Sequence, residues 1–86
     1  MTNEEIKQTL LAALDLDEVY VKNDGSHFSI IAVGNLFSEL SRVKRQQAVY
    51  GPLSEKVADG TMHAVSIKTF TPEDWARERS FHEPLN

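Results

Sequence analysis

The sequence predicts an α+β domain in which a three-stranded mixed sheet has its helices packed on one face. Two observations support this fold class. A turn segment, NDGS, joins two apolar segments with alternating side chains, which indicates an antiparallel hairpin. A helical segment then separates this hairpin from a third apolar segment, and such a crossover makes the third strand parallel to the second. The predicted order is helix, strand, strand, helix, strand, helix.

The first half of the chain contains a helix and the hairpin. Thr2 and Glu5 have the spacing of a capping box, and apolar residues follow at helical spacing, which predicts a helix over residues 3–14. Strands are predicted over residues 17–22 and 27–33, because both segments are rich in Val, Ile, Tyr and Phe. After the second strand, we expect a Gly-Asn break and a short apolar helical turn.

The second half begins with the longest predicted helix. Ser41 is expected to cap it and Gly60 to end it, while Pro52 kinks it, because proline cannot donate a backbone hydrogen bond. Its predicted buried face consists of Val43, Tyr50, Leu53 and Val57.

A third strand over residues 62–70 and a short helix complete the predicted fold. In this strand His63 shares the face of Val65 and Ile67, since side chains alternate with period two. Thr71 is the expected cap of the last helix, where proline is tolerated at the first position.

Length and composition limit the domain organisation and the location. A chain of 86 residues suffices for one domain with one core. We expect residues 1–79 to form it, and residues 80–86 to form a flexible tail in which His82 is unstructured. The acidic N-terminus and the lack of a long apolar run predict a cytoplasmic protein that does not bind membranes.

Histidine is the side chain on which a metal site would depend. The chain has no cysteine, so a soft metal would need imidazole or a partner's sulfur. His27 and His63 each stand at the start of a predicted strand, and parallel strands place both at the same rim of the domain. They are either ligands whose site another molecule completes, or polar residues whose ring N–H groups are bonded locally.

A basic cluster, Arg42, Lys44 and Arg45, begins the long helix, where cations are unfavourable by roughly 0.3–1 kcal/mol. It is either an anion-binding patch or a solvated face whose Arg stems pack on neighbours. The net charge of −4 argues against a broad nucleic-acid surface. The chain has no phosphate loop and no HExxH, and a stand-alone enzyme is not expected.

Three segments in this order, GSHFSIIAV, SRVKRQQAVYGPL and MHAVSIKTFTPEDW, resemble the BolA family, and within it the short bacterial IbaG-type members. The resemblance implies an αββαβα fold like that of class II KH domains. It also implies a heterodimer with a monothiol glutaredoxin that holds a [2Fe-2S] cluster, in which the glutaredoxin cysteine and glutathione supply sulfur. The family histidine before TP-x-x-W falls on His63, and His27 is the nearest match to a second ligand position.

Two other functions remain open under this resemblance. The family includes transcriptional regulators, for which Arg42, Lys44 and Arg45 would contact DNA, although the chain lacks the GxxG loop of KH domains and is acidic overall. A metal-free adaptor that binds glutaredoxin through the same rim is the third function. We expect the isolated chain to be a monomer without a bound cofactor.

Overall fold

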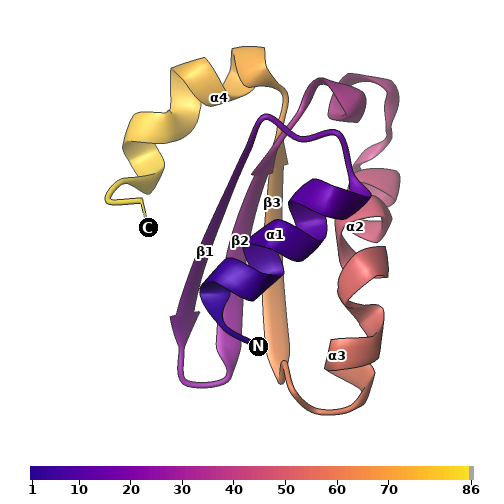
Figure 1. Ribbon diagram of the computed structural model, residues 1–86. Helices are drawn as coiled ribbons and strands as arrows, with labels where there is room; N and C mark the ends of the chain where they lie inside the picture. Colours follow the sequence, from indigo (N-terminus) through magenta and orange to yellow (C-terminus); the bar gives the residue numbers. More distant parts are fainter. Residues whose placement is uncertain (86) are drawn as a thin grey trace.

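The computed structural model describes residues 1–85 and contains one three-stranded sheet with helices on it (Figure 1). The strands are β1 (Glu18–Asp24), β2 (His27–Val33) and β3 (Ala64–Phe70), and they lie in the order β1-β2-β3. β1 and β2 are antiparallel, whereas β2 and β3 are parallel. The predicted α+β class and the mixed sheet are therefore confirmed.

Helix α1 (Asn3–Ala13) begins with the predicted capping box. The backbone N–H of Glu5 donates to Oγ1 of Thr2 at 3.1 Å, and the backbone N–H of Thr2 donates to Oε1 of Glu5 at 2.9 Å. The hydrogen bond that the Glu5 carboxylate accepts from the Thr2 backbone lowers the pKa of Glu5, and a hydrogen bond with the Thr2 side chain lowers it further. The box therefore contributes its stability above the ordinary carboxyl pKa and loses it as the pH falls through the lowered pKa.

The hairpin between β1 and β2 closes through Gly25 and Ser26. Asp24 pairs with His27 across the hairpin, and Gly25 has a φ of +62°. Within the described residues a positive φ occurs only at glycines, so Ser26 has a negative φ. Glycine at the first position of a two-residue loop is the signature of a type II′ turn. The predicted hairpin is confirmed, with Gly25–Ser26 as its loop because Asp24 still pairs in β1, and it places His27 at the end of the sheet.

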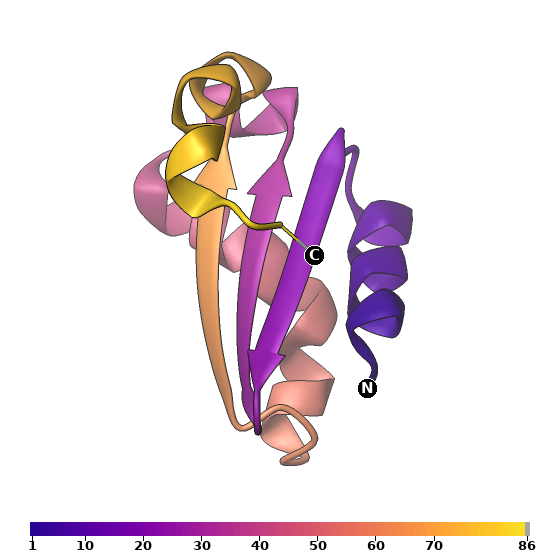
Figure 2. The same cartoon turned by 90° about the vertical axis from the view of Figure 1, so that its left-hand side faces the viewer.

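One face of the sheet is covered by α1, α2 (Arg42–Tyr50) and α3 (Ser54–Ala58), as Figures 1 and 2 show. The side chains buried between these helices and the sheet are apolar throughout. They are Ile6, Leu10, Val19, Val21, Phe28, Ile30, Ala32, Phe37, Val49, Leu53 and Met62.

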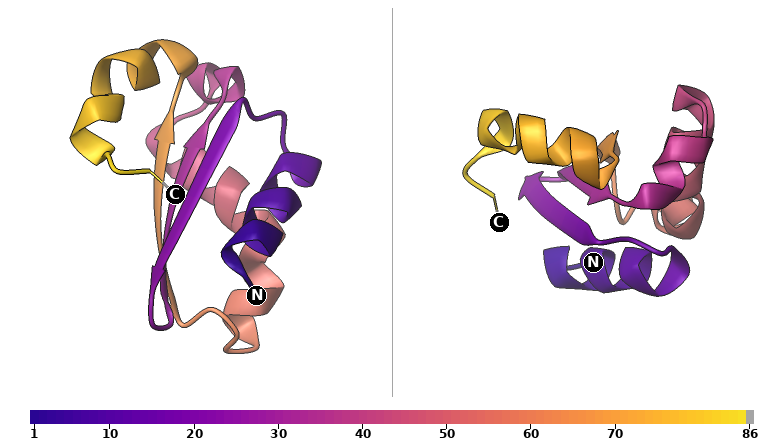
Figure 3. Two further views of the ribbon diagram at one scale, coloured as in Figure 1. Left: turned by 60° about the vertical axis from the view of Figure 1, so that its left-hand side comes forward. Right: turned by 90° about the horizontal axis from the view of Figure 1, so that it is seen from above.

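The prediction that all helices share one face is wrong, because α4 (Pro72–Glu78) lies on the opposite face (Figure 3). Val33 and Phe70 end their strands with side chains on that second face, since each follows a residue that points to the first. Trp75 packs on both and is only 2% exposed. The apolar side chains that end β2 and β3 would otherwise be exposed on this face, and α4 buries them.

The expectation that His82 is unstructured is also wrong. Residues Arg79–His82 form a 3₁₀ turn, η3, and the His82 ring lies 5.3 Å from the Phe70 ring and 5.8 Å from the Trp75 ring between centroids. Leu85 packs against the same cluster. Sequence periodicity cannot reveal this contact, because the contact depends on where β3 and α4 place the rings of Phe70 and Trp75 in the fold. The flexibility of residues 80–85 stays a prediction, and residue 86 lies outside the described residues.

The long predicted helix is interrupted at Pro52, where a 3₁₀ turn, η2 (Gly51–Leu53), separates α2 from α3. Its predicted buried face is confirmed at Leu53 and Val57, which pack in the core, and wrong at Val43 and Tyr50. Val43 and Tyr50 are 64% and 42% exposed, whereas Val49 and Leu53 are fully buried. A single helical period cannot be extended across a 3₁₀ turn, because a 3₁₀ helix has three residues per turn instead of 3.6.

No helix within residues 1–85 combines the length and apolar character that crossing a bilayer requires.

Gly34 offers a first test of the packing. It lies between β2 and the 3₁₀ turn η1 (Asn35–Glu39), and a Cβ there would meet Cδ2 of Leu36 at 2.8 Å and the backbone oxygen of Asp15 at 3.1 Å. Gly34→Ala is therefore expected to lower the free energy of unfolding by about 1–3 kcal/mol in urea denaturation. Asn35→Ala, at the exposed neighbouring position, should change it by less than about 0.5 kcal/mol. Equal stability of the two variants would contradict the close packing.

Candidate metal-ligand site

The two candidate histidines lie at the hairpin end of the sheet. His27 is the first residue of β2 and pairs with Ala64, the first residue of β3. His63 directly precedes Ala64, so the prediction that both histidines share one rim is confirmed. We refer to His27 and His63, with the Gly25–Ser26 loop beside them, as the histidine rim.

The backbone of His63 is held from both sides. Its N–H donates to the carbonyl of Ser26 at 3.2 Å, and the N–H of Ala64 donates to the same carbonyl at 3.3 Å. Just before it, the N–H of Met62 donates to the carbonyl of Lys56 at 3.1 Å. The loop and the strand start are therefore joined where the imidazole begins.

The loop that leads from α3 to His63 contains its own anchor. The backbone N–H of Thr61 donates to Oδ1 of Asp59 at 2.9 Å. Hydrogen bonds from the side chain and the backbone of Thr61 lower the pKa of Asp59. These hydrogen bonds therefore favour the ionised carboxylate, which anchors the loop just ahead of the histidine.

The predicted strand over residues 62–70 starts two residues too early. β3 begins at Ala64, and Met62 is fully buried in the core instead of lying on the open face with Ala64 and Ser66. The alternation rule fails here because the chain turns between the Met62 bond to Lys56 and the strand start. His63 is consequently a loop residue, and it is exposed.

The two imidazoles differ in their surroundings. Nε2 of His27 lies 2.9 Å from Oγ of Ser66, on the face of the sheet that α4 leaves open. Within residues 1–85, neither ring nitrogen of His63 has a hydrogen-bond partner, so both can reach an outside atom. Of the two alternatives for these residues, local bonding therefore applies to one nitrogen of His27 and to neither nitrogen of His63.

The described chain does not assemble a full ligand set by itself. Residues 1–85 contain no group of three His, Cys, Asp or Glu side chains placed to hold one metal ion. Two exposed imidazoles on a rigid backbone are suitable neutral donors for iron or zinc. The histidine rim therefore fits a shared site in which another molecule supplies the remaining ligands.

The structure divides the basic cluster. Arg42 and Lys44 are exposed, whereas Arg45 is half-buried and its Nε donates to the carbonyl of Leu40 at 3.1 Å. Arg42 and Arg45 line a cavity of about 730 Å³, and Lys44 does not. Sequence spacing groups the three residues, but helical rotation directs them differently.

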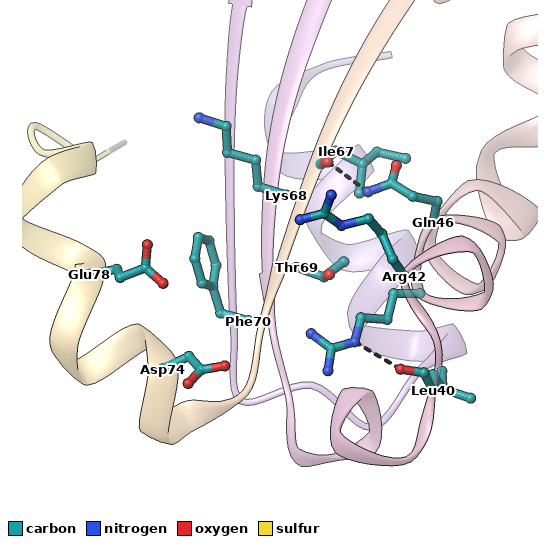
Figure 4. Close-up of a pocket in the computed structure, with 10 residues that line it drawn as sticks. Leu40, Arg42, Gln46, Ile67, Lys68, Thr69, Phe70, Asp74 and Glu78 are labelled. Atoms are coloured by element: carbon teal, nitrogen blue, oxygen red, sulfur yellow. Dashed lines mark hydrogen bonds between the residues drawn. The ribbon is translucent and has the colours of Figure 1, made fainter.

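This cavity, which we call the α2–α4 groove, lies along the last residues of β3 (Figure 4). Arg42 and Gln46 approach it from α2, and Asp74 and Glu78 approach it from α4 on the other side. The sequence does not reveal this groove, because its walls are some 30 residues apart in the chain and meet only when α4 crosses to the second face. It lies beside the second half of β3, residues 67–70, and extends from roughly 10 to roughly 20 Å from the strand start at the histidine rim, at the usual rise of a strand.

Comparison with known proteins gives consistent results. A family model described as BolA-like protein matches residues 4–74. The protein named acid stress protein IbaG from Escherichia coli K12 is 58% identical over 82 residues, which cover 95% of this chain and 98% of that protein. The DNA-binding transcriptional regulator BolA from Haemophilus influenzae is 32% identical over 73 residues, covering 83% of this chain and 70% of that protein.

Among solved structures, the solution structure of BolA1 from Mus musculus superimposes with a TM-score of 0.78 and 29% sequence identity. The match covers 90% of this chain and 70% of that one. The similarity therefore extends through nearly all the elements described above.

Proposed function

Because the chain belongs to the BolA family and is similar to its IbaG-type members, we propose that it partners a monothiol glutaredoxin in [2Fe-2S] cluster binding or transfer. In this role His63 supplies one ligand to iron, and His27 is the candidate for a second. Sulfur comes from the glutaredoxin cysteine and from glutathione, since this chain contains no cysteine.

The observation that carries the proposal is the placement of His63. Its imidazole is exposed and has no hydrogen-bond partner in residues 1–85, while its backbone is fixed by the bond to Ser26. A ligand held by its backbone needs little reordering when a partner approaches. The lack of a three-ligand group in the same part of the chain supports a site completed by the partner.

Imidazole ligation has two chemical consequences for a [2Fe-2S] cluster. A neutral imidazole in place of a thiolate removes negative charge from the cluster and raises its reduction potential. It also makes the bond sensitive to acid, because a proton competes with iron for the same nitrogen. We therefore expect the shared cluster to be released as the solution is acidified, at a pH where an all-thiolate cluster persists.

Substitution of His63 tests the proposed ligand. The chain is mixed with a monothiol glutaredoxin, glutathione, iron and sulfide under anaerobic conditions, and visible absorption and circular dichroism are recorded. His63→Ala is expected to shift the spectrum and to lower cluster affinity by about 10- to 100-fold. A spectrum identical to that of the wild-type complex would remove His63 from the ligand set.

His27 and His82 provide the matched comparisons. His27→Ala should also change the spectrum if its free ring nitrogen binds iron, whereas His82→Ala should not, because His82 packs on Phe70 and Trp75 at the other end of the sheet. A stable complex that is colourless under these conditions would instead support the metal-free adaptor.

DNA binding is the second candidate function, and the Haemophilus influenzae relative described as a DNA-binding transcriptional regulator favours it. Arg42 and Lys44 are exposed at the start of α2 and could contact phosphates. A gel-shift titration at two salt concentrations tests this role. DNA binding predicts retardation that weakens with salt and in an Arg42/Lys44 double alanine variant, and no retardation at low salt would exclude it.

A further inference from the structure

We propose that the α2–α4 groove binds an extended acidic segment of a partner protein, which adds as a fourth strand to the outer edge of β3. This site is independent of the histidine rim and of any bound metal. The argument depends on the hydrogen-bonding groups of the edge, the side chain that now occupies it and the charges of the two walls.

The outer edge of β3 presents backbone groups of alternate residues. Within the described chain β3 pairs only with β2, so one edge has no strand beside it. The carbonyl of Phe70 accepts the N–H of Gly34, and the N–H of Ala64 donates to Ser26, so the even-numbered residues face β2. Backbone direction alternates along a strand, and Ile67 and Thr69 therefore direct their N–H and C=O groups outward into the groove.

The Gln46 side chain confirms that the Ile67 carbonyl points outward, and it marks one position of the proposed added strand. Its side-chain amide, Nε2, donates to the carbonyl of Ile67 at 2.9 Å (Figure 4). An amide N–H from a neighbouring strand would make the same bond. The exposed Gln46 side chain thus occupies one strand position, and a peptide can displace it by exchanging one amide for another.

The charges of the two walls select the kind of segment. Side chains of an added strand alternate between the face of α2, where they meet Arg42 and Arg45, and the face of α4. In residues 1–85 the ion pairs are made by Arg77 with Glu73 and Asp74 within α4, so no ion pair bridges the groove. Arg42 is therefore available to a carboxylate, which indicates acidic residues at alternate positions of the partner.

A peptide fits this groove better than a nucleic acid. Ile67 and Thr69 offer donors and acceptors at strand spacing, which match a peptide backbone. Asp74 and Glu78 on the second wall would repel phosphates, whereas small polar side chains of a peptide can lie beside them. The volume of about 730 Å³ lies in the usual range of ligand sites, about 300–1,000 Å³.

The experiment uses the metal-free full chain, labelled with ¹⁵N, and a short synthetic peptide in which Glu alternates with Thr. We expect its NMR titration to shift signals of residues 67–70 and of the start of α2, and to leave the histidine rim unchanged. Two isomeric peptides, N-methylated at the Glu or at the Thr residues, provide the decisive comparison. One isomer should bind at least about tenfold more weakly, since its methyl groups replace the N–H donors that face β3, and the other should bind like the parent.

Variants of the chain separate charge from backbone pairing. Arg42→Glu is expected to weaken binding about tenfold, whereas Lys44→Glu, on the same helix but outside the groove, should change it less than about twofold. Thr69→Pro removes an outward N–H and should weaken binding, while Thr69→Val keeps it. Gln46→Ala should strengthen binding about threefold, because the Ile67 carbonyl becomes free.

Three results would overturn the proposal. The first is equal binding of both N-methylated isomers, or absence of binding by the parent peptide. The second is a single-stranded oligonucleotide that shifts the groove signals and depends equally on Arg42 and Lys44 when the peptide does not bind. The third is self-association of the chain that is lost in Thr69→Pro, which would assign the edge to a second copy.

Discussion

Trp75→Ala is expected to lower the free energy of unfolding by about 3–5 kcal/mol, the range for truncation of a large buried aromatic side chain. Trp75 is 2% exposed, and its ring centroid lies 5.1 Å from that of Phe70 and 5.7 Å from that of Tyr20. It is the main contact between α4 and the sheet, so its loss should release the C-terminal segment together with the helix. Urea denaturation measures the change, and the intensities of C-terminal amide signals report the release.

Two comparisons test the physical reason. Trp75→Phe should cost less than the alanine variant, because Nε1 of Trp75 is buried and lacks a hydrogen-bond partner in the described chain, so its removal breaks no hydrogen bond. Phe81→Ala, at a side chain that is 79% exposed, should change stability by less than about 0.5 kcal/mol. A small loss in Trp75→Ala would show that the second face does not hold α4.

Met62→Ala is expected to lower the free energy of unfolding by about 2–5 kcal/mol. The Met62 side chain is fully buried in the core, with 0% of its surface accessible to solvent, and Met62 directly precedes His63. Its truncation leaves a cavity beneath the histidine rim and loosens the backbone that carries the proposed ligand. Denaturation measures the first effect, and NMR relaxation of the His63 amide reports the second.

The neighbouring positions separate packing from chemistry. Met62→Leu keeps the buried volume and should cost less than about 1.5 kcal/mol. His63→Ala should change the stability of the isolated chain by less than about 0.5 kcal/mol, since the imidazole is exposed, although it is expected to impair cluster binding strongly. A large stability loss in His63→Ala would indicate that this histidine serves the fold.

The two sites proposed for this protein lie beside different parts of β3. The histidine rim is at its start, and the α2–α4 groove is beside its second half, Ile67–Phe70. A partner that supplies sulfur and a partner that supplies an acidic strand could therefore bind at the same time. The Arg42→Glu and His63→Ala variants should affect peptide binding and cluster binding independently, because Arg42 lines the groove and His63 does not.

The sequence alone determined the elements whose signals are local. The Thr2–Glu5 capping box, the hairpin turn at Gly25 and the interruption of the long helix at Pro52 each act within a few residues, and the structure contains all three. The parallel pairing of β2 with β3 follows from a helical crossover, which is also a property of chain order. Together these local signals place His27 and His63 at one rim of the domain.

The tertiary structure alone decided which surfaces are covered. The buried phase of α2, the position of α4 on the second face and the packing of His82 on Trp75 all depend on contacts between segments distant in the chain. The α2–α4 groove belongs to the same class, since its walls meet only after the strands have paired. Local patterns specify backbone conformation, but burial is a property of the whole molecule, because it depends on which apolar surfaces find each other.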